Sequence, residues 1–86
     1  LKVHATGTID HAPVYVREIA RAALAYGASA VLLAHNHPSG DCTPSAADIA
    51  VTKEIEAALK MLGIATHDHL IIGRDRHCSF RSLGLL

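Results

Sequence analysis

A short apolar run that ends in two histidines constrains this chain more than any other part of its sequence. Residues 29–34 are almost entirely apolar, which predicts a strand covered on both faces of a sheet. Side chains two residues apart in a strand point to the same face. The sequence therefore predicts that the imidazoles of His35 and His37 converge at the end of this strand.

A carboxylate follows the two histidines at the start of a predicted helix. Ser45 and Asp48 form a Ser-x-x-Asp pattern, which is typical of a capping box at a helix N-terminus. From the first helical turn, Asp48 can also reach back toward His35 and His37. Two imidazole nitrogens and one carboxylate oxygen leave one coordination position open, as in a catalytic zinc site. We therefore expect these three residues to bind a metal ion, with helix capping as a second role for Ser45 and Asp48.

The other segments alternate between strand and helix patterns. Apolar stripes at helical spacing predict two helices, and Gly27 and Gly63 follow them as stops. The order βαβαββ favours helices packed on a mixed sheet. The expected strands are 1–9, 29–34, 70–72 and 77–81, the expected helices are 14–26 and 45–62, and the buried stripes are Val16, Ile19, Ala23 and Tyr26 in the first helix and Val51, Ile55, Ala58, Leu59 and Leu62 in the second.

Length and charge argue against several classes of protein. The 86 residues, half of them apolar, predict one small domain, and the missing initiator Met predicts a fragment of a longer chain. Eight basic residues balance eight acidic ones, so the formal net charge is zero. This balance argues against a strong electrostatic nucleic-acid binder. No apolar run approaches the ~20 residues that span a bilayer, so we expect no membrane association.

The two cysteines, Cys42 and Cys78, are far apart and form no CxxC pair. Although they could form a disulfide, we expect free thiols in a reducing cytosol, and hence a cytoplasmic protein. The seven histidines are many for a chain of this length, and a metal site is one explanation.

The segment HNHPSGDCTPSAAD at 35–48 resembles the JAMM motif, His-x-His-Pro-x6-Ser-x2-Asp, of JAB/MPN metalloprotease domains. Further segments resemble the bacterial RadC family, also called UPF0758, so the resemblance runs over the whole length. These segments are Gly7-Thr8, VREI at 16–19, DHLIIG at 68–73, Ser79-Phe80 and Gly84.

The resemblance implies a fold and an activity. The fold is expected to be a three-layer α/β/α sandwich, with helices on both faces of a mixed sheet. Zn²⁺ is expected on His35, His37 and Asp48, and the Ser45 hydroxyl is expected to be the catalytic group that steadies the tetrahedral intermediate. The implied reaction is zinc-dependent hydrolysis of an amide bond in a peptide or isopeptide substrate. The RadC name is historically associated with DNA repair, which the JAMM motif itself does not support.

One position departs from the pattern. Active JAMM proteins carry a general-base Glu on an early strand, and Lys2 stands where the resemblance places it. Glu18 is the only early Glu in the chain, and we expect it to be a solvated charge on a helix. Three alternatives stay open: the base lies upstream of Leu1, the chain is a weak hydrolase that relies on zinc alone to activate water, or it is a non-catalytic, metal-bearing JAB domain. A DNA-repair-associated module is a further alternative.

A third histidine, His69, begins a predicted buried strand beside Asp68. An Asp-His pair recurs in RadC-like sequences, so His69 could hydrogen bond to a metal ligand. Alternatively, it could be a core histidine whose hydrogen bonds are made within the core. His67 shares its face, so this pair could also form a second, weak metal site. If upstream strands are missing, the sheet has an open edge that could pair with a second copy of the chain. A homodimer is therefore a possible assembly.

Overall fold

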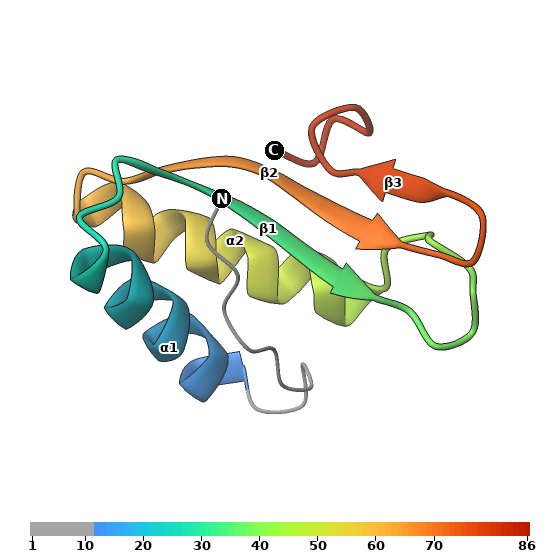
Figure 1. The fold of residues 1–86 in the computed structure, drawn as a ribbon, viewed down its shortest axis with the longest axis horizontal. Coiled ribbons are helices and arrows are strands. Elements are labelled where there is room, and N and C mark those ends of the chain that lie inside the picture. Colours follow the sequence, from blue (N-terminus) through green and yellow to red (C-terminus); the bar gives the residue numbers. More distant parts are fainter. Residues whose placement is uncertain (1–11) are drawn as a thin grey trace.

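The computed structural model describes residues 12–86, which form two helices and three strands (Figure 1). The described elements are α1 (Ala12–Ala25), β1 (Ala30–Asn36), α2 (Ala46–Met61), β2 (Ala65–Ile72) and β3 (His77–Ser79). They follow the predicted order, although β2 begins earlier than predicted and β3 is shorter. The predicted strand at 1–9 lies outside the described residues.

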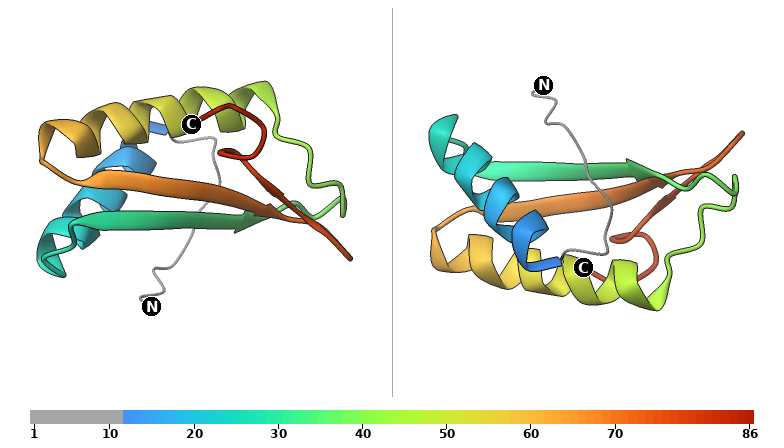
Figure 2. Two further views of the ribbon diagram at one scale, coloured as in Figure 1. Left: turned by 90° about the horizontal axis from the view of Figure 1, so that it is seen from above. Right: turned by 90° about the horizontal axis from the view of Figure 1, so that it is seen from below.

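The described strands form a mixed sheet in the order β1-β2-β3. β1 and β2 pair in parallel, and β3 pairs antiparallel with β2. α2 is the crossover between the two parallel strands and runs beside them (Figure 2). Because β1 and β2 are parallel, their carboxyl ends lie at the same edge of the sheet. The N–H of His37 donates to the carbonyl of Ile72 at 3.0 Å, so pairing continues to the end of both strands.

One apolar cluster joins both described helices to the sheet. Leu33 is the one buried residue of β1, and it packs in this cluster together with residues of α1 and α2. Both helices therefore cover the face of the sheet on which Leu33 lies. The buried members of the cluster are Ala23, Leu33, Val51, Ile55, Leu59 and Ile64, and Val16, Ile19, Ala20, Ala28 and Val31 pack against them.

The predicted helical stripes are buried or partly buried except at their last residues. Tyr26 is 53% exposed and Leu62 is 44% exposed. Both residues lie beyond the end of their helix, where the chain turns away at Gly27 and Gly63, which have φ angles of 63° and 74°. Neither helix within residues 12–86 combines the length and hydropathy that a membrane span requires.

Within residues 12–86, β1 is not covered on both faces as predicted. It is the edge strand of the described sheet, and Leu32, which points away from the helices, is 49% exposed. An apolar run alone cannot distinguish a central strand from an edge strand, because the neighbouring layers are distant in sequence. The described residues thus show two layers of a mixed α/β fold, and the third layer of the sandwich stays a prediction.

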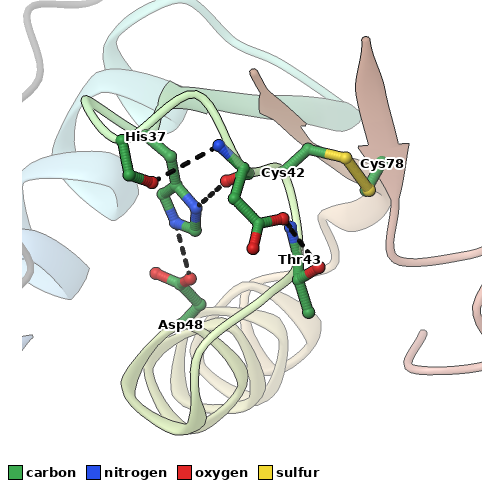
Figure 3. The surroundings of a disulfide bond; sticks show 7 residues. His37, Cys42, Thr43, Asp48 and Cys78 are labelled. Atoms are coloured by element: carbon green, nitrogen blue, oxygen red, sulfur yellow. Dashed lines mark hydrogen bonds and ion pairs between the residues drawn. A yellow bond between two sulfur atoms is a disulfide. The ribbon is translucent and has the colours of Figure 1, made fainter. Parts of the chain in front are cut away.

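The expectation of free cysteines is wrong. Cys42 and Cys78 form a disulfide, with their Cα atoms 5.5 Å apart across a sequence separation of 36 residues (Figure 3). The antiparallel pairing of β3 places Cys78 opposite Ile71, and the loop after β1 returns past this point. Sequence spacing could not reveal the pairing because the β2–β3 hairpin creates it. The cytoplasmic expectation, which rested partly on free thiols, stays a prediction without that support.

Candidate metal centre

The structure brings the three predicted metal ligands together at the carboxyl end of β1. His35 lies within the strand, His37 follows its last residue, and Asp48 lies in the first turn of α2. His35 Nε2 lies 3.3 Å from Asp48 Oδ1, and His37 Nε2 lies 2.9 Å from Asp48 Oδ2. One ligand atom from each residue lies within 4.8 Å of the other two. This spacing suits three protein ligands around one small cation.

Helix capping holds Asp48 in place. Ser45 is the N-cap of α2, and its Oγ accepts a hydrogen bond from the Asp48 N–H at 3.0 Å. In return, the Ser45 N–H donates to Asp48 Oδ2 at 2.7 Å, which completes a capping box. Burial raises the pKa of Asp48, but the Ser45 hydrogen bonds and the neighbouring histidines outweigh it and lower that pKa. Asp48 therefore caps the helix and presents an anionic carboxylate to both histidines.

A backbone carbonyl determines which nitrogen of His37 carries a proton. His37 Nδ1 lies 2.7 Å from the carbonyl oxygen of Asp41, which can only accept a hydrogen bond (Figure 3). Nδ1 therefore carries the hydrogen, and in a neutral ring Nε2 has a free lone pair. That lone pair faces Asp48 Oδ2 at 2.9 Å, which is another acceptor. Two acceptors at this distance need a cation between them, either a proton or a metal ion.

The hydrogen bonding of His35 Nε2 shows whether the site suits a metal ion. Its Nε2 is buried and makes no hydrogen bond to any described residue, although Asp48 Oδ1 lies 3.3 Å away. Burial is the main cause that lowers the pKa of His35, so its imidazole is neutral at neutral pH. A neutral imidazole nitrogen without a partner, beside a carboxylate, is the donor set that zinc prefers. The residues present therefore fit a bound Zn²⁺.

His69 lies directly behind His35. Its Nε2 is 2.8 Å from His35 Nδ1, and its side chain is buried. Burial, followed by the nearby His35, lowers the pKa of His69 to about 4. His67, by contrast, is exposed, and β2 is irregular at this point of its pairing with β1. Within residues 12–86, His35, His37 and Asp48 form the only group of three or more His, Cys, Asp or Glu side chains that lie close enough to hold a metal ion, so the described residues give no support to a second site.

Of Lys2 and Glu18, only Glu18 lies within the described residues. Glu18 lies on α1 and pairs with Arg21 at 3.5 Å, in agreement with its prediction as a helix surface charge. Lys2 lies outside the described residues. Sequence reasoning missed Thr52, which hydrogen bonds to His69 Nδ1 at 2.7 Å. Its position four residues after Asp48 places it on the same helix face, which was the only signal available. The Asp41 carbonyl belongs to the backbone and left no signal in the sequence.

Comparison with known proteins identifies the family. The family model of the RadC-like JAB domain matches residues 1–85. A UPF0758 protein of Rhodobacter capsulatus is 58% identical over 82 residues, which is 95% of this chain and 38% of that relative. The chain thus spans well under half of the length of the relative that it matches. On both comparisons, the chain belongs to the family of RadC-like JAB domains.

Proposed function

We propose that this chain is a zinc-dependent hydrolase that cleaves amide bonds in a peptide or isopeptide substrate. The observation that carries the proposal is the buried Nε2 of His35, which has no hydrogen-bond partner among residues 12–86 and faces the same carboxylate as His37 Nε2. His35, His37 and Asp48 would hold the zinc ion. Three protein ligands leave one position open, which is typical of catalytic rather than structural zinc.

The chain's own residues would prepare this site for amide hydrolysis. When bound, zinc supplies a Lewis acid that polarises a carbonyl group and lowers the pKa of water to about 7. The capping box fixes the Asp48 carboxylate, and the Asp41 carbonyl fixes the ring of His37. Ser45 Oγ accepts a hydrogen bond from the Asp48 N–H. The Ser45 hydroxyl hydrogen is therefore available to donate to an oxyanion that develops beside the site.

Ligand removal tests the proposal. We expect one zinc ion per chain by elemental analysis, and cleavage of a fluorogenic amide substrate that depends on it. His35→Ala is expected to abolish both zinc binding and cleavage, whereas the exposed His77→Ala is the matched control and should retain both. Ser45→Ala should retain zinc but lose about 10²–10³-fold in rate. A His35→Ala variant that retains zinc and cleaves at the unchanged rate contradicts the proposal.

A second candidate function is a metal-bearing JAB domain without catalysis. The favouring observation is that the carboxylates of Asp48 and Asp41 both take part in interactions with other residues. Asp48 faces the histidines, and Asp41 Oδ1 accepts hydrogen bonds from the Thr43 N–H and hydroxyl at 2.9 and 2.8 Å. The hydrogen bonds from Thr43 lower the pKa of Asp41, which makes it a weaker base, and Asp48 is placed as a metal ligand.

The variant Lys2→Glu separates the two candidates. If the chain lacks a general base, placing Glu at the family position should raise the rate of amide cleavage by about 10²–10⁴-fold without changing zinc content. If the base comes from another segment, the substitution should leave the rate unchanged. A chain that binds zinc fully and cleaves no amide with either residue is the non-catalytic domain. The zero net charge gives no support to a function in nucleic-acid binding.

A further inference from the structure

We propose that Thr52 and His69 are positioning residues that hold His35 in the one tautomer able to bind a metal ion. The inference deepens the proposed zinc site and rests on it. It concerns a continuous chain of hydrogen bonds from the backbone of α2, through Thr52 and His69, to His35. Neither Thr52 nor His69 is itself placed as a ligand.

The chain of hydrogen bonds starts at a carbonyl group. Thr52 Oγ1 lies 2.6 Å from the carbonyl oxygen of Asp48, which can only accept, so the Thr52 hydroxyl donates there. With its single proton used, Thr52 Oγ1 can only accept from His69 Nδ1, which lies 2.7 Å away. Thr52 is fully buried, so no solvent competes for these bonds. His69 therefore carries its hydrogen on Nδ1.

The proton assignment passes through His69 to His35. His69 is 2% exposed, and burial disfavours a charged ring with hydrogens on both nitrogens. Its Nε2 therefore has no hydrogen and accepts from His35 Nδ1 at 2.8 Å. His35 then carries its hydrogen on Nδ1, which leaves Nε2 with a lone pair. This is the nitrogen that faces Asp48 and has no hydrogen-bond partner in the described part of the chain.

The hydrogen-bond chain is needed because the carboxylate alone favours the other tautomer. Asp48 Oδ1 lies 3.3 Å from His35 Nε2 and would attract a hydrogen on that nitrogen, which would block a metal ion. An acceptor behind the ring, at Nδ1, opposes this preference. His37 has the same arrangement with a different acceptor, the Asp41 carbonyl. Both imidazoles thus present Nε2 to the site because something behind each ring takes the other hydrogen.

Packing fixes the plane of the His69 ring, which is the middle member of this hydrogen-bond relay from Thr52 to His35. The ring of Phe80 stacks on that of His69 with centroids 4.6 Å apart and an interplanar angle of 19°. The His69 N–H donates to Asp68 Oδ1 at 2.7 Å, which anchors its backbone. Asp48 provides both the backbone carbonyl that accepts from Thr52 and the carboxylate that faces His35. The hydrogen bonds therefore fix the positions of His35 and Asp48 relative to the same turn of α2.

The test compares two buried threonines. Thr52→Val removes the hydroxyl with little change of shape, and Thr52→Ser restores it. Thr66→Val is the matched control, because Thr66 is also buried but its Oγ1 has no hydrogen-bond partner among the described residues. We expect Thr52→Val to weaken zinc binding by about 10–100-fold in a chelator competition. Thr52→Ser and Thr66→Val should bind zinc nearly as the parent does.

A second readout needs no zinc, and its decisive result comes from the parent chain alone. Long-range ¹H–¹⁵N NMR of the metal-free chain at neutral pH assigns the hydrogen of each imidazole. We expect the hydrogen of His35 on Nδ1 in the parent, and partly on Nε2 in Thr52→Val. A parent chain with this hydrogen on Nε2 overturns the proposal, even if Thr52→Val does not fold. So does a Thr52→Val variant that binds zinc as tightly as Thr66→Val. Neither readout requires amide cleavage, so failure of the relay and failure of the proposed function are distinguishable.

Discussion

Replacing both disulfide cysteines by serine tests how far this small domain depends on a covalent link. The bond joins the loop before α2 to β3 and closes a segment of 36 residues. Closing a loop of that length restricts the unfolded chain by about 4 kcal/mol in the chain-entropy account. A small domain has about 5–15 kcal/mol of stability in total. The double variant Cys42→Ser with Cys78→Ser should therefore lose a large share of its free energy of unfolding.

Urea unfolding of the metal-free protein measures this loss. The oxidised parent should unfold at a much higher urea concentration than the double variant. The reduced parent is the control and should resemble the variant, because reduction removes the link without changing the sequence. A thiol reagent added to the unfolded, unreduced parent should find no free thiol. Equal unfolding midpoints for the oxidised parent and the double variant would refute the reasoning.

The same variant should also affect the metal site. Cys42 follows Asp41, whose carbonyl accepts the hydrogen of His37 Nδ1. Hydrogen bonds from Thr43 to the Asp41 carboxylate hold the same loop, so the loop should loosen rather than unfold. We expect zinc affinity to fall by about 10-fold, since loss of a group that orients a ligand has effects of this size.

Three further predictions concern stability. Burial holds the pKa of His69 at about 4, below its ordinary value of 6.5, so the unfolded chain takes up the proton first. The metal-free chain should therefore lose about 3 kcal/mol as the pH falls from about 6.5 to about 4 in stepped urea titrations, and His69→Gln should lose most of this slope. Ser45→Ala removes the cap of α2 and should cost about 1 kcal/mol in urea unfolding, whereas Ser45→Thr should cost less. Gly73→Ala would place a methyl group against the Gly40 carbonyl and should cost about 1–3 kcal/mol by thermal unfolding, while Asp75→Ala in the same exposed turn should be nearly neutral.

Local signals predicted the helices well, and they also predicted that His35, His37 and Asp48 lie close together. The predicted helix at 45–62 corresponds to α2 at Ala46–Met61, because a Ser cap and a following Gly act within a few residues of the boundary. The His-x-His spacing places both imidazoles at the end of β1 for the same kind of reason. Strand geometry alone sends side chains two residues apart to one face.

Contacts between distant segments could not be predicted in this way. β2 begins at Ala65 rather than at residue 70, because pairing with β1 extends a strand whose first residues are mostly polar. The disulfide and the exposure of Leu32 likewise depend on which elements become neighbours.

The amino-acid sequence by itself determined where the helices end, which residues carry metal-binding chemistry and which family the chain resembles. Each of these depends on spacing along the chain. The tertiary structure alone decided that Thr52 and His69 stand behind His35, and that Cys42 meets Cys78. The physical reason is that hydrogen-bond partners and proton positions are set by atoms packed together from different elements, and spacing along the chain does not encode that packing.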